Sequence, residues 1–240
     1  MNKCLTMLVI LIMASSLESM AATSPEDRIK KINTFQDSVK NYKEKNTERD
    51  LLKKLILAEA RSEGTLGMAV VARSILNRHA LINTPGIKHR GTPVKPGTFN
   101  ARGKSLTDII MAKGQYTPIK DGSINEPRTK EELLQAEEAI NMAKDTRLLM
   151  QNLVDDREQK FSSGSPDYRE NMKEIMTLIE STGFRNPSLT FENTSQEANM
   201  TRFGNHVFTT IANPYIDENF LSEEEQRNAK PEYALPQPVR

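Results

Sequence analysis

The residue best suited to do chemistry in this chain is Glu59, which occupies a position where a core helix would normally carry leucine. At 100° per residue, it falls near the middle of an apolar stripe formed by Leu51, Leu52, Leu55 and Ile56. A carboxyl group in apolar surroundings loses hydration, which raises its pKa and makes it a proton donor near neutral pH. Glu59 is therefore predicted to be a general acid. An interior ion pair, or a place in bulk water away from any cavity, would contradict this hypothesis.

Other polar residues could assist Glu59, but each also has a simpler interpretation. Glu63 follows one turn later beside Gly64, as a second carboxylate of the same site or as a surface residue at a helix end. Asn205 and His206 follow Gly204, where they could line a pocket or satisfy a buried turn. Both interpretations stay open for each of these residues.

The sequence does not contain the motifs of several common catalytic chemistries. The three histidines stand in unrelated contexts, and no HxxxH or HExxH pattern is present, so we expect no metal site and no cofactor. There is no GxSxG motif and no phosphate-binding Walker loop. A zinc hydrolase is disfavoured, and no serine stands out as a nucleophile.

The charges of the chain are balanced, with 33 basic and 32 acidic residues among 240. A net charge of +1 provides no global field for nucleic acid or an anionic membrane, so no nucleic acid partner is expected. Residues 80–105 are locally basic and rich in proline and glycine. They are interpreted either as a solvated surface or as a cleft wall that contacts a polymer.

The first 21 residues have the pattern of a cleaved signal peptide. Lys3 precedes an apolar run, and Ser19-Met20-Ala21 fits the small-x-small rule for cleavage before Ala22. The run is shorter than the ~20 residues that span a bilayer, although an uncleaved N-terminal helix is the alternative. We expect a periplasmic or secreted protein with no integral membrane segment after cleavage. Its only cysteine, Cys4, would be removed with the signal.

The elements that would position these residues are mostly helices. An amphipathic helix is predicted within residues 22–48, starting near Ser24-Pro25. Residues 51–77 form two helices joined by a glycine-broken turn, and further helices are expected near 106–112, 130–145, 147–159 and 167–183. Strand signals come late, at 188–191 and 206–211. The fold class is thus α+β and predominantly helical, with a main domain over 49–215 and a polar tail over 216–240.

An ordered set of motifs resembles the cell wall hydrolase family of the spore-cortex-lytic enzyme SleB. The set begins with Ala58-Glu59-Ala60-Arg61, Gly67 and the run 69–78, which is AVVARSILNR. It continues with Gln115-Tyr116, Leu189-Thr190-Phe191 and the closing stretch 204–208, GNHVF. Order and rough spacing agree over about residues 50–211. Residues 22–48 and 212–240 lie outside the resemblance.

The resemblance implies a single lysozyme-like, lytic-transglycosylase-like domain that cleaves peptidoglycan glycan strands between N-acetylmuramic acid and N-acetylglucosamine. It assigns the catalytic acid to Glu59 and implies substrate contacts from the later motifs and the neighbouring carboxylate: Gln115, Tyr116, Phe191, Asn205, His206 and Glu63. Because no second catalytic carboxylate is evident, a lytic transglycosylase is favoured over a plain hydrolase.

The chain also departs from this family. It contains no tryptophan, so stacking on sugars would have to come from Tyr116, Phe99, Phe191, Phe203 or Tyr215. Residues 117–187 also exceed the usual length. The alternative function is therefore a cell-wall-binding or effector protein that keeps the fold with altered or lost catalysis. An accessory protein that licenses activity is not identifiable from the sequence.

Overall fold

The computed structural model describes residues 25–84, 88–89, 92–160, 168–185 and 197–211. Within these ranges the chain is mostly helical, with a small three-stranded antiparallel sheet, which agrees with the predicted α+β class. The predicted signal peptide, the strand at 188–191 and the polar tail lie outside the described residues.

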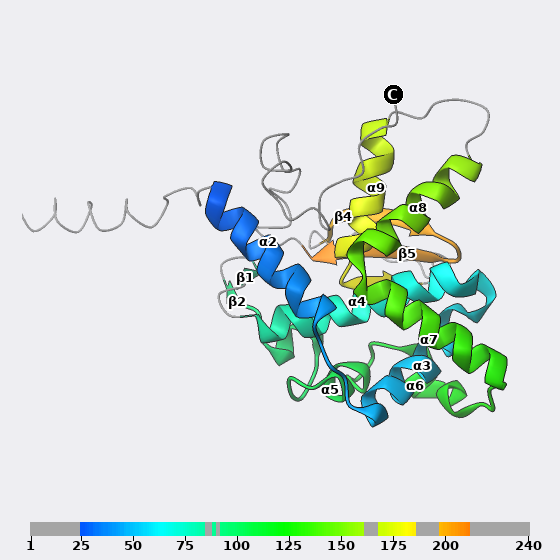
Figure 1. The fold of residues 1–240 in the computed structure, drawn as a ribbon. Coiled ribbons are helices and arrows are strands. Elements are labelled where there is room, and N and C mark those ends of the chain that lie inside the picture. Colours follow the sequence, from blue (N-terminus) through cyan, green and yellow to red (C-terminus); the bar gives the residue numbers. More distant parts are fainter. Residues whose placement is uncertain (1–24, 85–87, 90–91, 161–167, 186–196, 212–240) are drawn as a thin grey trace, which may run out of the picture.

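The helix α4 (Gly64–Asn83) forms the centre of the molecule (Figure 1). Every residue from Gly67 to Ile82 is buried, the polar side chains among them included. The helix α3 (Asn46–Ala60) precedes it through the short 3₁₀ turn η2 (Arg61–Glu63). The predicted pair of helices joined by a turn is thus confirmed, and the second helix runs six residues beyond its expected end.

The N-terminal helix α2 (Pro25–Lys40) packs across α4 and buries Phe35 and Val39. Its start at Pro25 agrees with the prediction. The helix α3 starts at Asn46 without a side-chain cap from the residue before it. Instead, the Glu48 carboxylate accepts the backbone N–H of Lys45.

The middle of the chain contributes short elements and then long helices. After the two-residue strands β1 (Lys88–His89) and β2 (Thr92–Pro93) come η3 (Pro96–Phe99), α5 (Leu106–Ile110), α6 (Thr117–Asp121) and η4 (Ser123–Asn125). Thr129 caps α7 (Lys130–Lys144), which packs along α4 and agrees with the helix expected near 130–145. Leu133 and Leu134 are 37% and 59% exposed because the buried face of α7 runs through Ala136, Ile140 and Ala143.

The helices α8 (Thr146–Lys160) and α9 (Tyr168–Glu180) pack against each other, and α9 covers the sheet (Figure 1). The sheet has the order β3 (Gly183–Arg185), β5 (His206–Ile211), β4 (Glu197–Phe203). The predicted strand at 206–211 is confirmed as the central strand. The sequence analysis missed β3 and β4, and the predicted helix ending at Gly183 ends at Glu180.

Among the described residues, no helix combines the length and the apolar character needed to cross a bilayer.

Candidate active site

Glu63 joins the turn after α3 to the first residues of β5. Its Oε1 accepts a hydrogen bond from the backbone N–H of Asn205 at 3.0 Å and lies 2.7 Å from Nδ1 of His206. The side chain is only 4% exposed. The surface interpretation of Glu63 is therefore wrong, because residues 143 positions apart in the chain meet here.

Two glycines make room for this carboxylate. A Cβ on Gly204 would lie 2.5 Å from Oε2 of Glu63, and a Cβ on Gly67 would also collide with the Glu63 side chain. Gly204 has φ = 56°, a left-handed conformation that glycine adopts at little cost. The Gly67 and Gly204 positions of the resemblance thus have a physical reason, which is close approach to Glu63.

His206 lies between two carboxylates. Its Nδ1 faces Glu63, and its Nε2 lies 3.8 Å from Oε2 of Glu59. Burial is the largest single influence on the pKa of His206, and it favours the neutral ring. The hydrogen bonds and charges of Glu59 and Glu63 together outweigh burial and raise the pKa to about 9. At neutral pH the ring is therefore an imidazolium that donates from Nδ1 to Glu63.

Glu59 retains contact with open space. Its side chain is 14% exposed and lines a cavity of about 230 Å³ together with Arg61, Ser62, Ser123, Glu126 and Arg128. The closer ion pair of His206 is with Glu63, and the Glu59 carboxylate stands at the longer distance on the opposite side of the ring. Glu59 thus lies beside a cavity, as the hypothesis requires, but it is also the partner of His206 in a largely buried ion pair. Its surroundings are nevertheless less purely apolar than the sequence pattern predicted.

Arg78 binds two further predicted site residues, Gln115 and Tyr116. Its Nη1 donates to Oε1 of Gln115 at 2.7 Å and to the hydroxyl of Tyr116 at 3.0 Å, while its Nε donates to the carbonyl of Thr182. The guanidinium also lies 5.4 Å from the ring centre of Tyr116 and 5.5 Å from that of Phe99. Gln115 and Tyr116 are thereby fixed against α4 and the start of β3.

Phe184 contacts both the Arg78 group, through Tyr116, and the Glu63 group, through His206. Its ring lies 5.8 Å from that of Tyr116 and 5.3 Å, edge to face, from the imidazole of His206. Burial raises the pKa of the Tyr116 phenol, and the Glu59 charge raises it further against the opposing influence of Arg78. Glu59, Glu63 and His206 therefore share one region of the molecule with Gln115 and Tyr116.

The aromatic residues predicted to stack on sugars are not exposed where the structure describes them. Phe99, Tyr116 and Phe203 are 4–7% exposed and form part of the core, so their ring faces are not presented to a sugar. Phe191 and Tyr215 lie outside the described residues. Asn205 is exposed and contributes its backbone N–H rather than a side-chain contact.

Sequence reasoning missed Arg78 and Phe184 as organising residues. A signal for Arg78 existed, because it and Arg73 are the cations within the otherwise apolar run of α4 and therefore must find buried partners. Phe184 had no signal, since the short strand β3 was not predicted.

No group of three or more His, Cys, Asp or Glu side chains in the described ranges is arranged to hold a metal ion. Comparison of the chain with protein-family models, with curated proteins and with solved structures finds no significant match.

Proposed function

We propose that the protein is a peptidoglycan glycan-strand lytic enzyme of the SleB-like type, with a lysozyme-like domain and Glu59 as its acid and base. The observation that carries the proposal is the cluster of Glu59, His206 and Glu63 beside the cavity at Glu59. This cluster combines a solvent-accessible carboxyl, a charged imidazole and a buried carboxylate. Such an arrangement is typical of sites that exchange protons.

Glu63 acts as a positioning residue in this mechanism. Two donors, the N–H of Asn205 and the ring of His206, hold its carboxylate in place, and its burial keeps it away from a substrate. It holds His206 with Nε2 directed toward Glu59. Glu59, by contrast, lines the cavity and is the carboxyl of the cluster that a substrate can reach.

The reaction then proceeds through Glu59 alone. Its carboxyl protonates the glycosidic oxygen that leaves C1 of N-acetylmuramic acid, and the resulting carboxylate is stabilised by the nearby imidazolium of His206. The carboxylate next takes the proton of the muramyl 6-hydroxyl, whose oxygen bonds to C1 and forms a 1,6-anhydro end. No second free carboxylate is needed, which favours the transglycosylase route because Glu63 is already bound to His206.

Digestion of purified sacculi tests the proposal. Muropeptides with anhydro ends support the transglycosylase, reducing ends indicate a hydrolase, and pelleting with the wall without release indicates the alternative function, a wall-binding protein.

The variant Glu59→Gln is the matched control, because Gln keeps the volume of Glu but cannot supply a proton. We expect activity to fall by roughly 10²–10⁴-fold with little change in the thermal unfolding midpoint. Full activity in Glu59→Gln would refute the assigned role of Glu59.

A further inference from the structure

The cavity at Glu59 is narrow because two segments that are distant in sequence face each other across it. One side is the end of α3 with the turn η2, which carries Ser62, and the other is the segment 122–129 before α7, which carries Ser123 and Glu126. The space between them measures about 230 Å³. Cleavage of a glycan strand requires a sugar residue on each side of the broken bond, and pockets for ligands of that size measure roughly 300–1,000 Å³. As bounded by the described residues, the cavity is therefore too small for the strand that the proposed function requires.

The segment 122–129 is held together by its own hydrogen bonds. The N–H of Asn125 donates to the carbonyl of Gly122 at 3.0 Å, and Nη2 of Arg128 donates to the carbonyl of Ser123 at 3.1 Å. Ile124 is the one buried apolar side chain of the segment, and the turn η4 that carries it packs against α3. The segment can therefore move as a unit without losing its internal hydrogen bonds.

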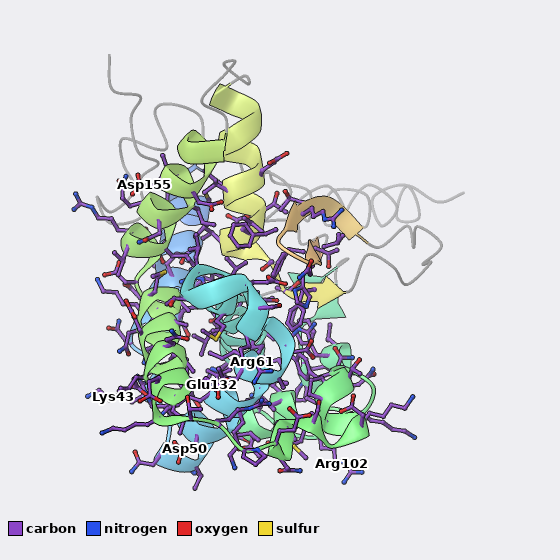
Figure 2. All side chains as sticks on the ribbon, turned by 90° about the vertical axis from the view of Figure 1, so that its right-hand side faces the viewer. Lys43, Asp50, Arg61, Arg102, Glu132 and Asp155 are labelled. Atoms are coloured by element: carbon purple, nitrogen blue, oxygen red, sulfur yellow. The ribbon has the colours of Figure 1, made fainter. Side chains whose placement is uncertain are left out.

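An ion pair joins this segment to the opposite side of the cavity. Nη1 of Arg61, in η2, donates to Oε1 of Glu132, in the first turn of α7, at 3.0 Å (Figure 2). The other oxygen of Glu132 accepts the N–H of Thr129, the last residue of the segment, at 2.8 Å. The side chains of Arg61 and Glu132 are 56% and 20% exposed, so the pair is weak and is screened by salt.

We propose that residues 122–129 are a cover that the ion pair Arg61–Glu132 holds closed over Glu59, and that this cover moves aside before a glycan strand enters. Release of the ion pair and of Ile124 widens the cavity on the side that faces Glu59, while the cover keeps its internal hydrogen bonds. That the entering ligand is a glycan strand rests on the proposed function, whereas the movement of the cover does not depend on it.

Thiol labelling of a buried cysteine measures this movement without enzymatic turnover. In the full chain carrying Cys4→Ser, Ile124→Cys reports the opening of the cover, and Ala139→Cys, on the buried face of α7, reports global unfolding. Glu132→Gln removes the charge that binds Arg61 but keeps the capping box of α7, because Gln accepts the same N–H. We expect Glu132→Gln to speed labelling of Ile124→Cys about two- to fivefold, as the loss of an exposed ion pair implies, and to leave that of Ala139→Cys unchanged.

Glu131→Gln is the matched control, because Glu131 is an exposed acid in the same turn of α7. It should label at the parent rate. Added salt should speed labelling of Ile124→Cys in the parent but not in Glu132→Gln, because salt screens the pair. An unchanged rate in Glu132→Gln, or equal acceleration at Ala139→Cys, would overturn the cover. Ser123→Cys, probed with a bulky maleimide, serves if Ile124→Cys does not fold.

Sacculus digestion separates the cover from the proposed function. If the cover limits entry, kcat/KM of Glu132→Gln should exceed that of the parent and of Glu131→Gln by the same factor as the labelling rate. Faster labelling with unchanged kcat/KM overturns the gating role of the cover. Faster labelling without digestion by any variant refutes only the enzyme.

Discussion

Two buried polar clusters of different character lie along α4, one at its middle and one at its start. Toward the middle of α4, Arg73 is fully buried and donates to the carbonyl of Ala143 at 2.9 Å, to that of Ile179 at 3.2 Å and to Gln36. Asn77, one turn later, donates to the carbonyls of Ile179 and Ser181. This cluster connects α2, α7 and α9 to α4.

At the start of α4, Glu63 belongs to a cluster in which one buried oxygen lacks a hydrogen-bond partner. One of its oxygens binds Asn205 and His206, while Oε2 is buried with no partner. The histidine is charged, and the next carboxylate, Glu59, stands 3.8 Å away beside a cavity. The cavity and the charged histidine distinguish this cluster from the Arg73 cluster, since buried polar atoms without a partner also occur elsewhere in the described residues, Oδ1 of Asn77 among them.

The comparison separates a polar cluster that connects helices from one that the proposed function would use. The Arg73 guanidinium makes its hydrogen bonds inside the core, although Oδ1 of Asn77 beside it is buried without a partner, and connecting four helices is sufficient to explain this arginine. The Glu63 cluster instead contains a charged histidine between two carboxylates beside a cavity, together with a buried oxygen that has no partner. Substitutions in the two clusters should therefore have different consequences.

The largest expected effect is on the Arg73 side. Arg73→Met would leave two buried carbonyls and the Gln36 amide short of donors, and we expect the free energy of unfolding to fall by roughly 3 kcal/mol or more. Denaturant titration measures this loss. The folded fraction should keep the parent pH–rate profile on sacculi. A change in that profile would show that Arg73 has more than a structural role.

A pH dependence of stability should come from the other cluster. The pKa of His206 is raised to about 9 from 6.5, so the protonated ring stabilises the fold fully below pH 6.5, and this stabilisation is lost as pH rises from about 6.5 to 9. We expect a loss on the order of 2 kcal/mol, since partial contact with water weakens the pair. Denaturant titrations across this range measure it.

Glu63→Gln is the matched variant for that pH series, because Gln accepts the same hydrogen bonds without the charge. The stability of Glu63→Gln should vary less over pH 6.5–9 than that of the parent. An equally steep curve would assign the effect to another group.

A smaller effect is expected at Gly204. Gly204→Ala places a side chain at φ = 56° and against Oε2 of Glu63, whereas Gly114→Ala introduces a similar positive φ of 76° with no atom within 4 Å. Backbone strain should cost about 1–2 kcal/mol in each variant. Only Gly204→Ala should also shift the pH dependence set by His206. If both variants showed the same pH dependence of stability, the contact of Gly204 with Glu63 would have no effect on the ionisation of His206.

Local sequence patterns predicted much of the helical fold. The apolar spacing of 51–77, the glycine at its break and the capping residue Thr129 act within a few positions, so helix boundaries near them agree with the structure. The same spacing placed Glu59 on an apolar stripe. The strands β3 and β4 were missed because they are short or polar and their pairing with β5 joins distant segments.

By itself the sequence determined that a carboxylate would stand on the inner face of a helix just before a turn, because helical periodicity depends only on neighbouring residues. The tertiary structure decided that Glu63 is buried and that His206 is charged, since both follow from contacts across 143 residues. It also placed Arg128 and Ser123 on the cavity at Glu59. No local pattern contains such contacts, because they exist only after α4 has brought the turn, the sheet and the loop before α7 together.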